Sequence, residues 1–150
     1  MRIVFMDYGS AMPVDQRVIE AMMPYFGQEF GNPSSMHSTG RHAKSLIEEA
    51  RTKVAQLIGA ENEKSIIFTS GFTESNNLAL RGIAYRNRDK GNHIITTTIE
   101  HMSVLNTCKY LQKNGFDISY IPVDKDGIVD IEKLKSEITS KTILISVMYA

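Results

Sequence analysis

The sequence contains a single cysteine, Cys108, so it has no internal disulfide and no zinc site built from several cysteines. Cys108 falls within a predicted helix, where a buried structural thiol is the simplest interpretation. His37 and His42 are five residues apart, a spacing that does not place both side chains on one helical face. We therefore predict no metal site.

The sequence also lacks a surplus of charge of either sign. Seventeen basic residues balance seventeen acidic ones, and neither kind forms a long run, which argues against binding to nucleic acid or to an anionic membrane. The apolar stretch before Asp7 is too short for a signal peptide, and no later run is long enough to span a bilayer. We expect a cytoplasmic protein whose partner is a small molecule or another protein.

The first sixty residues have helical patterning. Apolar side chains at three- and four-residue spacing predict a helix with Pro13 in its first turn that ends before Gly27. A polar stretch over residues 30–40 predicts an ordered loop. A second helix is predicted from about Arg41, with its apolar positions on one face, until Gly59 supplies a stop.

From residue 65 onward, strands and helices alternate. Strands are predicted over 65–69, 93–98, 117–121 and 142–147, and helices over about 73–83, 101–113 and 131–138. This order predicts an α/β fold with a mainly parallel sheet between helical layers, a three-layer αβα arrangement. We expect residues 1–60 to form an N-terminal helical segment and residues 61–150 the first part of a larger domain, because no helix remains to cover the apolar last strand.

A glycine lies between the strand predicted at 65–69 and the helix that follows it. Free N–H groups and the positive end of the helix dipole favour an anion there, most naturally a phosphate, and the Thr73 hydroxyl adds an uncharged donor. Such turns are also simple connectors that bind nothing. The common nucleotide-binding glycine patterns are absent, so ATP and NAD are poor candidates for the ligand.

His101 follows the end of the strand predicted at 93–98. In a parallel sheet this position shares the carboxyl edge with the glycine turn, and ligands of open α/β sheets collect at that edge. An imidazole there can stack on a flat heteroaromatic ring or exchange protons at neutral pH. The alternative is a histidine at a helix start with no ligand.

Several short motifs in the same order resemble cysteine desulfurases of the NifS and IscS type, within the class V aminotransferases. They are Asp7-Tyr8, Pro13, Phe30-Gly31-Asn32-Pro33-Ser34-Ser35-x-His37-Ser38, Ser70-Gly71-x-Thr73-Glu74-x-Asn76-Asn77 and Glu100-His101-x-Ser103. The resemblance covers the whole chain. It implies the fold-type I architecture of enzymes that use pyridoxal 5′-phosphate (PLP), with residues 61–150 as part of the large PLP-transferase domain.

The resemblance also implies an activity. Enzymes of this family convert L-cysteine to L-alanine and an enzyme persulfide, act as homodimers and pass sulfur to an iron–sulfur scaffold protein. By resemblance, Phe72 and Thr73 contact the cofactor phosphate, and His101 stacks on its pyridine ring as a catalytic residue. Asn32 and His37 belong to a loop that approaches the pocket or the dimer contact, although turn chemistry gives both a structural alternative.

The sequence departs from the family pattern in three ways. Gly9-Ser10-Ala11-Met12 stands where family members usually carry small residues and threonines. Phe72 stands where the family usually has a small residue. Its side chain crowds the turn but leaves the backbone donors available. Residues 1–150 also lack the family's Schiff-base lysine, persulfide cysteine and pyridine-pairing aspartate, and Cys108 lies far from where that cysteine is expected. We therefore expect this chain alone to be inactive. A non-catalytic interaction or dimerisation element, or part of a related enzyme such as a selenocysteine lyase, remains an alternative.

Overall fold

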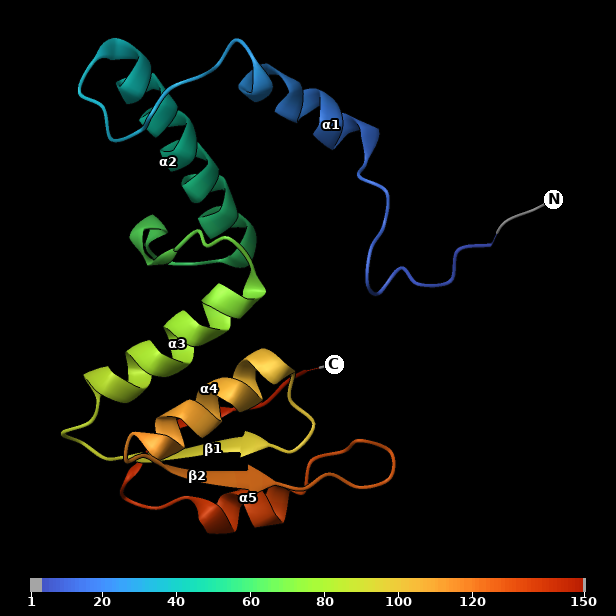
Figure 1. The fold of residues 1–150 in the computed structure, drawn as a ribbon, viewed down its shortest axis with the longest axis vertical. Helices are drawn as coiled ribbons and strands as arrows, with labels where there is room; N and C mark the ends of the chain where they lie inside the picture. Colours follow the sequence, from blue (N-terminus) through green and yellow to red (C-terminus); the bar gives the residue numbers. More distant parts are fainter. Residues whose placement is uncertain (1–3, 150) are drawn as a thin grey trace. The chain divides into compact units, whose positions relative to one another are not determined.

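The computed structural model describes residues 4–149, which divide into two compact units after Ile67. Each unit has its own secondary structure (Figure 1). No helix within residues 4–149 combines the length and the apolar character needed to cross a bilayer.

The first unit begins with a short helix, α1 (Gln16–Met22), which continues as a 3-10 turn, η1 (Met23–Phe26). The prediction that Pro13 occupies the first turn of this helix is wrong. Asp15 is the N-cap, and its side chain accepts a hydrogen bond from the Arg17 amide at 2.9 Å, so the helix begins at Gln16. Pro24 lies in the first turn of η1, where its missing N–H costs no helical hydrogen bond.

Helix α2 (Ser38–Ile58) is the long helix of this unit and starts three residues earlier than the sequence pattern indicated. The reason is an unusual N-cap, because His37 Nδ1 accepts a hydrogen bond from the Gly40 amide at 3.3 Å. Gly40 is required there, since an added Cβ would lie 2.4 Å from the Ser35 carbonyl oxygen. At the other end, Gly59 adopts a left-handed conformation with φ of 68° and ends the helix as predicted.

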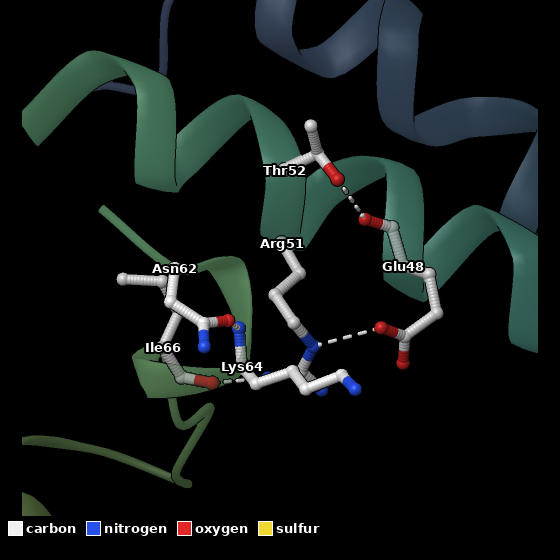
Figure 2. Close-up of polar contacts among 6 residues, drawn as sticks. All are labelled: Glu48, Arg51, Thr52, Asn62, Lys64 and Ile66. Atoms are coloured by element: carbon white, nitrogen blue, oxygen red, sulfur yellow. Dashed lines mark hydrogen bonds and ion pairs between the residues drawn. The ribbon is translucent and has the colours of Figure 1, made fainter. Parts of the chain in front are cut away.

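Arg51 attaches α2 to the turn that follows it, η2 (Glu63–Ser65). Figure 2 shows its guanidinium extended between two acceptors, the Glu48 carboxylate at 3.1 Å from Nε and the backbone carbonyl of Ile66. Asn62 caps η2 by accepting a hydrogen bond from the Lys64 amide at 2.8 Å. These contacts fix the path of the chain as it leaves α2.

We expect Arg51→Met, which keeps the aliphatic part of the side chain, to lower the free energy of unfolding of the full-length protein by about 1–2 kcal/mol. The substitution removes a charge-assisted hydrogen bond to a backbone carbonyl. Urea denaturation measures the change. Thr52→Val on the same helix, whose exposed hydroxyl bonds only the Glu48 carbonyl at 3.0 Å, is the matched control and should change stability less. An equal loss in both variants would contradict the role of Arg51.

The prediction of a strand over residues 65–69 is wrong. Ser65 ends the 3-10 turn η2, Ile66 has extended backbone with φ of −81° and ψ of 121°, and residues 66–69 pair with no other strand among the described residues. The β-branched and aromatic side chains favour extended backbone, but a strand also requires a neighbour that accepts its hydrogen bonds.

The second unit contains a parallel sheet of three strands in the order β2-β1-β3. They are β1 (His93–Thr97), β2 (Asp117–Ile121) and β3 (Thr142–Ser146), within one residue of the predicted bounds. Ile94 lies opposite Ile118 on one side and Leu144 on the other. Because β1 is central, all five of its residues are buried, whereas β3 at the sheet's edge is only partly buried.

Helices cover both faces of this sheet, so the α/β prediction is confirmed (Figure 1). Helices α3 (Phe72–Arg86) and α4 (Met102–Lys113) pack on one face, and α5 (Ile131–Glu137), capped by Asp130 as predicted, packs beside β2 on the other. The core between α3, α4 and the sheet consists of Leu80, Ala84, Ile94, Val104, Cys108, Leu111, Phe116 and Ile118.

A histidine joins the strands at the amino edge of the sheet. The buried His93 lies 2.8 Å from the Thr142 hydroxyl through Nδ1 and 3.0 Å from the Ser119 hydroxyl through Nε2. Ser119 in turn donates to Glu137 at 2.9 Å. This chain of hydrogen bonds connects all three strands to α5 and holds the amino edge together.

Candidate functional site at the carboxyl edge of the sheet

Two segments that are distant in the sequence meet beyond the carboxyl end of β1. One is the turn of residues 70–74, from which α3 starts, and the other is His101, which follows β1 and begins α4. The rings of Phe72 and His101 lie with their centroids 4.5 Å apart in an edge-on contact, with their planes at 67°. The glycine turn and the histidine are therefore neighbours, although among the described residues no strand precedes the turn in the sheet.

The 70–74 turn is held in shape by its own side chains. Glu74 accepts hydrogen bonds from the backbone amide and the hydroxyl of Ser70, at 2.7 Å and 2.6 Å. The hydroxyls of Thr69 and Ser75 lie 2.6 Å apart across the turn. The Ser70 hydroxyl, followed by its amide, lowers the pKa of Glu74, so this carboxylate is ionised at neutral pH.

These contacts use the Ser70 amide, whereas the Phe72 and Thr73 amides remain available to a ligand. Gly71 is the N-cap of α3 and supplies no side-chain cap. Within the described chain, neither the Phe72 nor the Thr73 amide donates to a protein acceptor, as is usual for the first turn of a helix. An added Cβ at Gly71 would meet nothing within 4 Å, so the space beside the turn is open. The Thr73 side chain is exposed beside these amides.

His101 is held from its protein side. It is the N-cap of α4, and its Nδ1 accepts a hydrogen bond from the Ser103 amide at 3.0 Å. The Ser103 hydroxyl also lies 3.0 Å from Nδ1. The imidazole itself is exposed, so Nε2 remains available to a ligand at the sheet edge.

Glu100, beside His101, links the ends of two strands. Its buried carboxylate accepts hydrogen bonds from the Thr97 hydroxyl at 3.0 Å and from the Met148 backbone amide at 2.7 Å. Thr97 ends β1 and Met148 follows β3. One oxygen atom therefore fixes the exit of the chain from β3 against the loop that carries His101.

Asn32 and His37 lie in the first unit, where both make local hydrogen bonds. The Asn32 side chain accepts from the Ser34 amide at 2.9 Å, and His37 caps α2. His42 Nε2 forms a hydrogen bond with the Glu29 carboxylate. Within residues 4–149, no group of three or more His, Cys, Asp or Glu side chains is arranged to hold a metal ion.

Residues 4–150 match the family model described as aminotransferase class V. The chain belongs to the class V aminotransferase family. Among curated relatives, this class V chain is 56% identical over 146 residues to "Cysteine desulfurase IscS 1" of Archaeoglobus fulgidus, covering 97% of the chain and 38% of that relative. It is 58% identical to "Cysteine desulfurase IscS" of Ehrlichia chaffeensis, again over 97% of the chain and 35% of the relative.

Solved structures give the same assignment. The class V chain superposes on a structure titled "NIFS-LIKE PROTEIN" with a TM-score of 0.90 and 41% identity, over 96% of the chain and 39% of that structure. A structure titled "SspA in complex with cysteine" follows with a TM-score of 0.85 and 38% identity, over 94% and 40%. The chain thus spans well under half the length of the proteins that it matches.

The residues present in this class V chain fit a phosphate-bearing cofactor. Two amides without protein acceptors, an exposed threonine hydroxyl and the start of a fifteen-residue helix form a donor set for a phosphate group. The neighbouring imidazole offers a flat surface for an aromatic ring. The sequence pattern gave no role to the contacts of Ser103 or to the Glu100–Met148 bond, because these depend on pairings between distant segments.

Proposed function

We propose that this chain is the N-terminal part of a PLP-dependent cysteine desulfurase, which removes sulfur from L-cysteine to give L-alanine and an enzyme persulfide. The observation that carries this proposal is the pair of free amides at Phe72 and Thr73, with His101 beside them. The relatives named cysteine desulfurase, which align over nearly the whole chain, support it and do not favour a non-catalytic interaction element.

In this proposal, the Phe72 and Thr73 amides and the Thr73 hydroxyl hold the phosphate, and His101 packs against the pyridine ring. Bound PLP supplies an electron sink for the bonds of an amino acid substrate. Among the described residues this donor set carries no positive side chain, so this part of the site would hold the phosphate through backbone dipoles and a hydroxyl. His101 can hold or pass a proton at Nε2, because Nδ1 is occupied by the Ser103 amide.

The proposal extends to the whole protein. We propose that residues 1–60 form an N-terminal helical segment and that residues 61–150 begin the cofactor-binding domain of a cytoplasmic homodimer. The dimer would deliver sulfur to an iron–sulfur scaffold protein. Asn32 and His37 are proposed contributors to the pocket or the dimer contact. The persulfide forms on a cysteine other than Cys108, which is fully buried in the core.

The Thr73 hydroxyl provides the test of the phosphate site. In the full-length protein we expect Thr73→Val to raise the dissociation constant for PLP roughly tenfold, because one hydrogen bond to a charged phosphate is lost. PLP titration followed by absorbance measures this change. Thr73→Ser keeps the hydroxyl and is the matched control, expected to bind close to wild type.

Sulfide release from L-cysteine by the PLP-loaded full-length protein, with dithiothreitol present to reduce the persulfide, tests the reaction itself. Full-length protein that binds no PLP, or that binds PLP and releases no sulfide from cysteine, would contradict the proposed function. A Thr73→Val protein with wild-type PLP affinity would contradict the phosphate site alone.

A further inference from the structure

The Ser103 hydroxyl lies between two side chains from different helices. Its Oγ is 2.8 Å from Asn76 Nδ2 on α3 and 3.0 Å from His101 Nδ1 at the start of α4. Ser103 is buried, with 7% of its surface exposed, whereas His101 is exposed. A buried serine and a half-buried asparagine therefore lie next to the Nδ1 side of the imidazole.

The direction of these hydrogen bonds follows from the chemistry of each group. An amide NH₂ can only donate, so Asn76 donates to Ser103 Oγ. His101 Nδ1 accepts the Ser103 backbone amide and so carries no proton in that arrangement. In its 3.0 Å contact with this unprotonated Nδ1 the Ser103 hydroxyl can only donate, so it shares the single lone pair of Nδ1 with the Ser103 amide. The proton of the neutral imidazole is then on Nε2, which points away from these donors.

We propose that Asn76 and Ser103 are positioning residues that fix the ring orientation of His101 and keep its neutral form protonated at Nε2. The imidazole then presents a hydrogen-bond donor, not an acceptor, to whatever binds at the carboxyl edge of the sheet. This inference deepens the proposed function, because it assigns residues that act through His101 on a ligand bound there.

A separate connection between α3 and α4 does not reach the imidazole. The Thr107 hydroxyl lies within hydrogen-bond distance of two acceptors, Asn77 Oδ1 at 3.0 Å and the Ser103 backbone carbonyl at 2.7 Å. Asn77 donates to the Thr73 carbonyl at 2.9 Å. These bonds hold the two helices together one turn further along α4. Asn77 and Thr107 thus hold α3 and α4 together. The hydrogen bond of Asn76 to Ser103 is a second link between the helices, and Ser103 also contacts His101.

The test uses full-length protein without cofactor, labelled with ¹⁵N in the histidine rings. Two-bond proton–nitrogen correlation spectra distinguish the two neutral tautomers, and His101→Asn identifies the His101 signals by their loss. We expect His101 in the Nε2–H form. Ser103→Ala removes the hydroxyl, and Asn76→Asp supplies a carboxylate that takes the hydroxyl proton away from Nδ1. Each should lower the ratio of the Nε2–H to the Nδ1–H form by roughly two- to tenfold.

Two further variants separate positioning from a general structural effect. Ser103→Thr keeps a hydroxyl and should retain the wild-type His101 signals. Asn106→Asp introduces the same charge on the exposed side of α4 and should leave them unchanged. A wild-type His101 in the Nδ1–H form would overturn the inference. Wild-type His101 signals in both Ser103→Ala and Asn76→Asp would overturn it too. The measurement involves no PLP, so its result is independent of whether the proposed function holds.

Discussion

Cys108 in the folded protein should react with iodoacetamide about two orders of magnitude more slowly at pH 8 than a free cysteine does. Its side chain is fully buried in the core between α4 and the sheet. Burial, with the nearby charge of Glu100 as a second cause, raises the pKa of this thiol from 9.0 to about 11. At pH 8 this leaves roughly a hundredfold fewer reactive thiolates, before the lack of access is counted.

Peptide-resolved mass spectrometry of the full-length protein measures this reactivity, because it separates Cys108 from other cysteines. Labelling in urea is the control and should proceed at the rate of a free thiol. A desulfurase whose other cysteines are alkylated should lose sulfide release while Cys108 stays unmodified. If Cys108 were labelled as rapidly in the native protein as in urea, its thiol would be accessible. Cys108 would then again be a candidate for the persulfide cysteine.

Glu100→Ala should lower the free energy of unfolding of the full-length protein by about 2–5 kcal/mol. The substitution leaves the buried Thr97 hydroxyl and the partly buried Met148 amide without their acceptor, and an unsatisfied buried donor costs about 1–3 kcal/mol. The effect is also local. The loop that carries His101 and the chain after β3 lose their common attachment, so amide hydrogen exchange near Met148 should accelerate.

Glu100→Gln is the matched variant. Its amide oxygen can still accept both hydrogen bonds, so most of the stability should be retained, with a loss set by the weaker neutral hydrogen bonds. Urea denaturation of both variants gives the comparison. If Glu100→Ala were as stable as Glu100→Gln, the carboxylate would not be the attachment that the geometry indicates.

The elements that the sequence predicted well are those whose signals are local. The strand at 117–121 and the helix capped by Asp130 agree with the structure, because apolar patterning and a capping side chain act within a few residues. The start of α2 was missed since histidine is an unusual N-cap, and His101 caps α4 in the same way. The predicted strand at 65–69 failed because pairing, unlike side-chain preference, depends on a distant neighbour.

In the candidate site too, contacts between residues that are distant in the sequence could not be predicted. The proximity of the glycine turn to His101 was predicted from a strand at 65–69 that does not form, and in the structure the packing of α3 on α4 brings the two together. The bond of Asn76 to Ser103 and that of Glu100 to Met148 could not be predicted, since they join residues 27 and 48 positions apart. Only the packing of α3 on α4 and the docking of β3 bring those atoms together.

The long separation between Glu100 and Met148 has a consequence for the order in which this unit folds. β1 can pair with β2 as soon as residue 121 is available. The Glu100 carboxylate finds its second partner, Met148, only after β3 has docked, and Met148 is 48 residues beyond Glu100. Closing the longer loop costs more chain entropy and comes later. We expect the edge that carries His101 to become ordered last, both in refolding and on a chain leaving the ribosome.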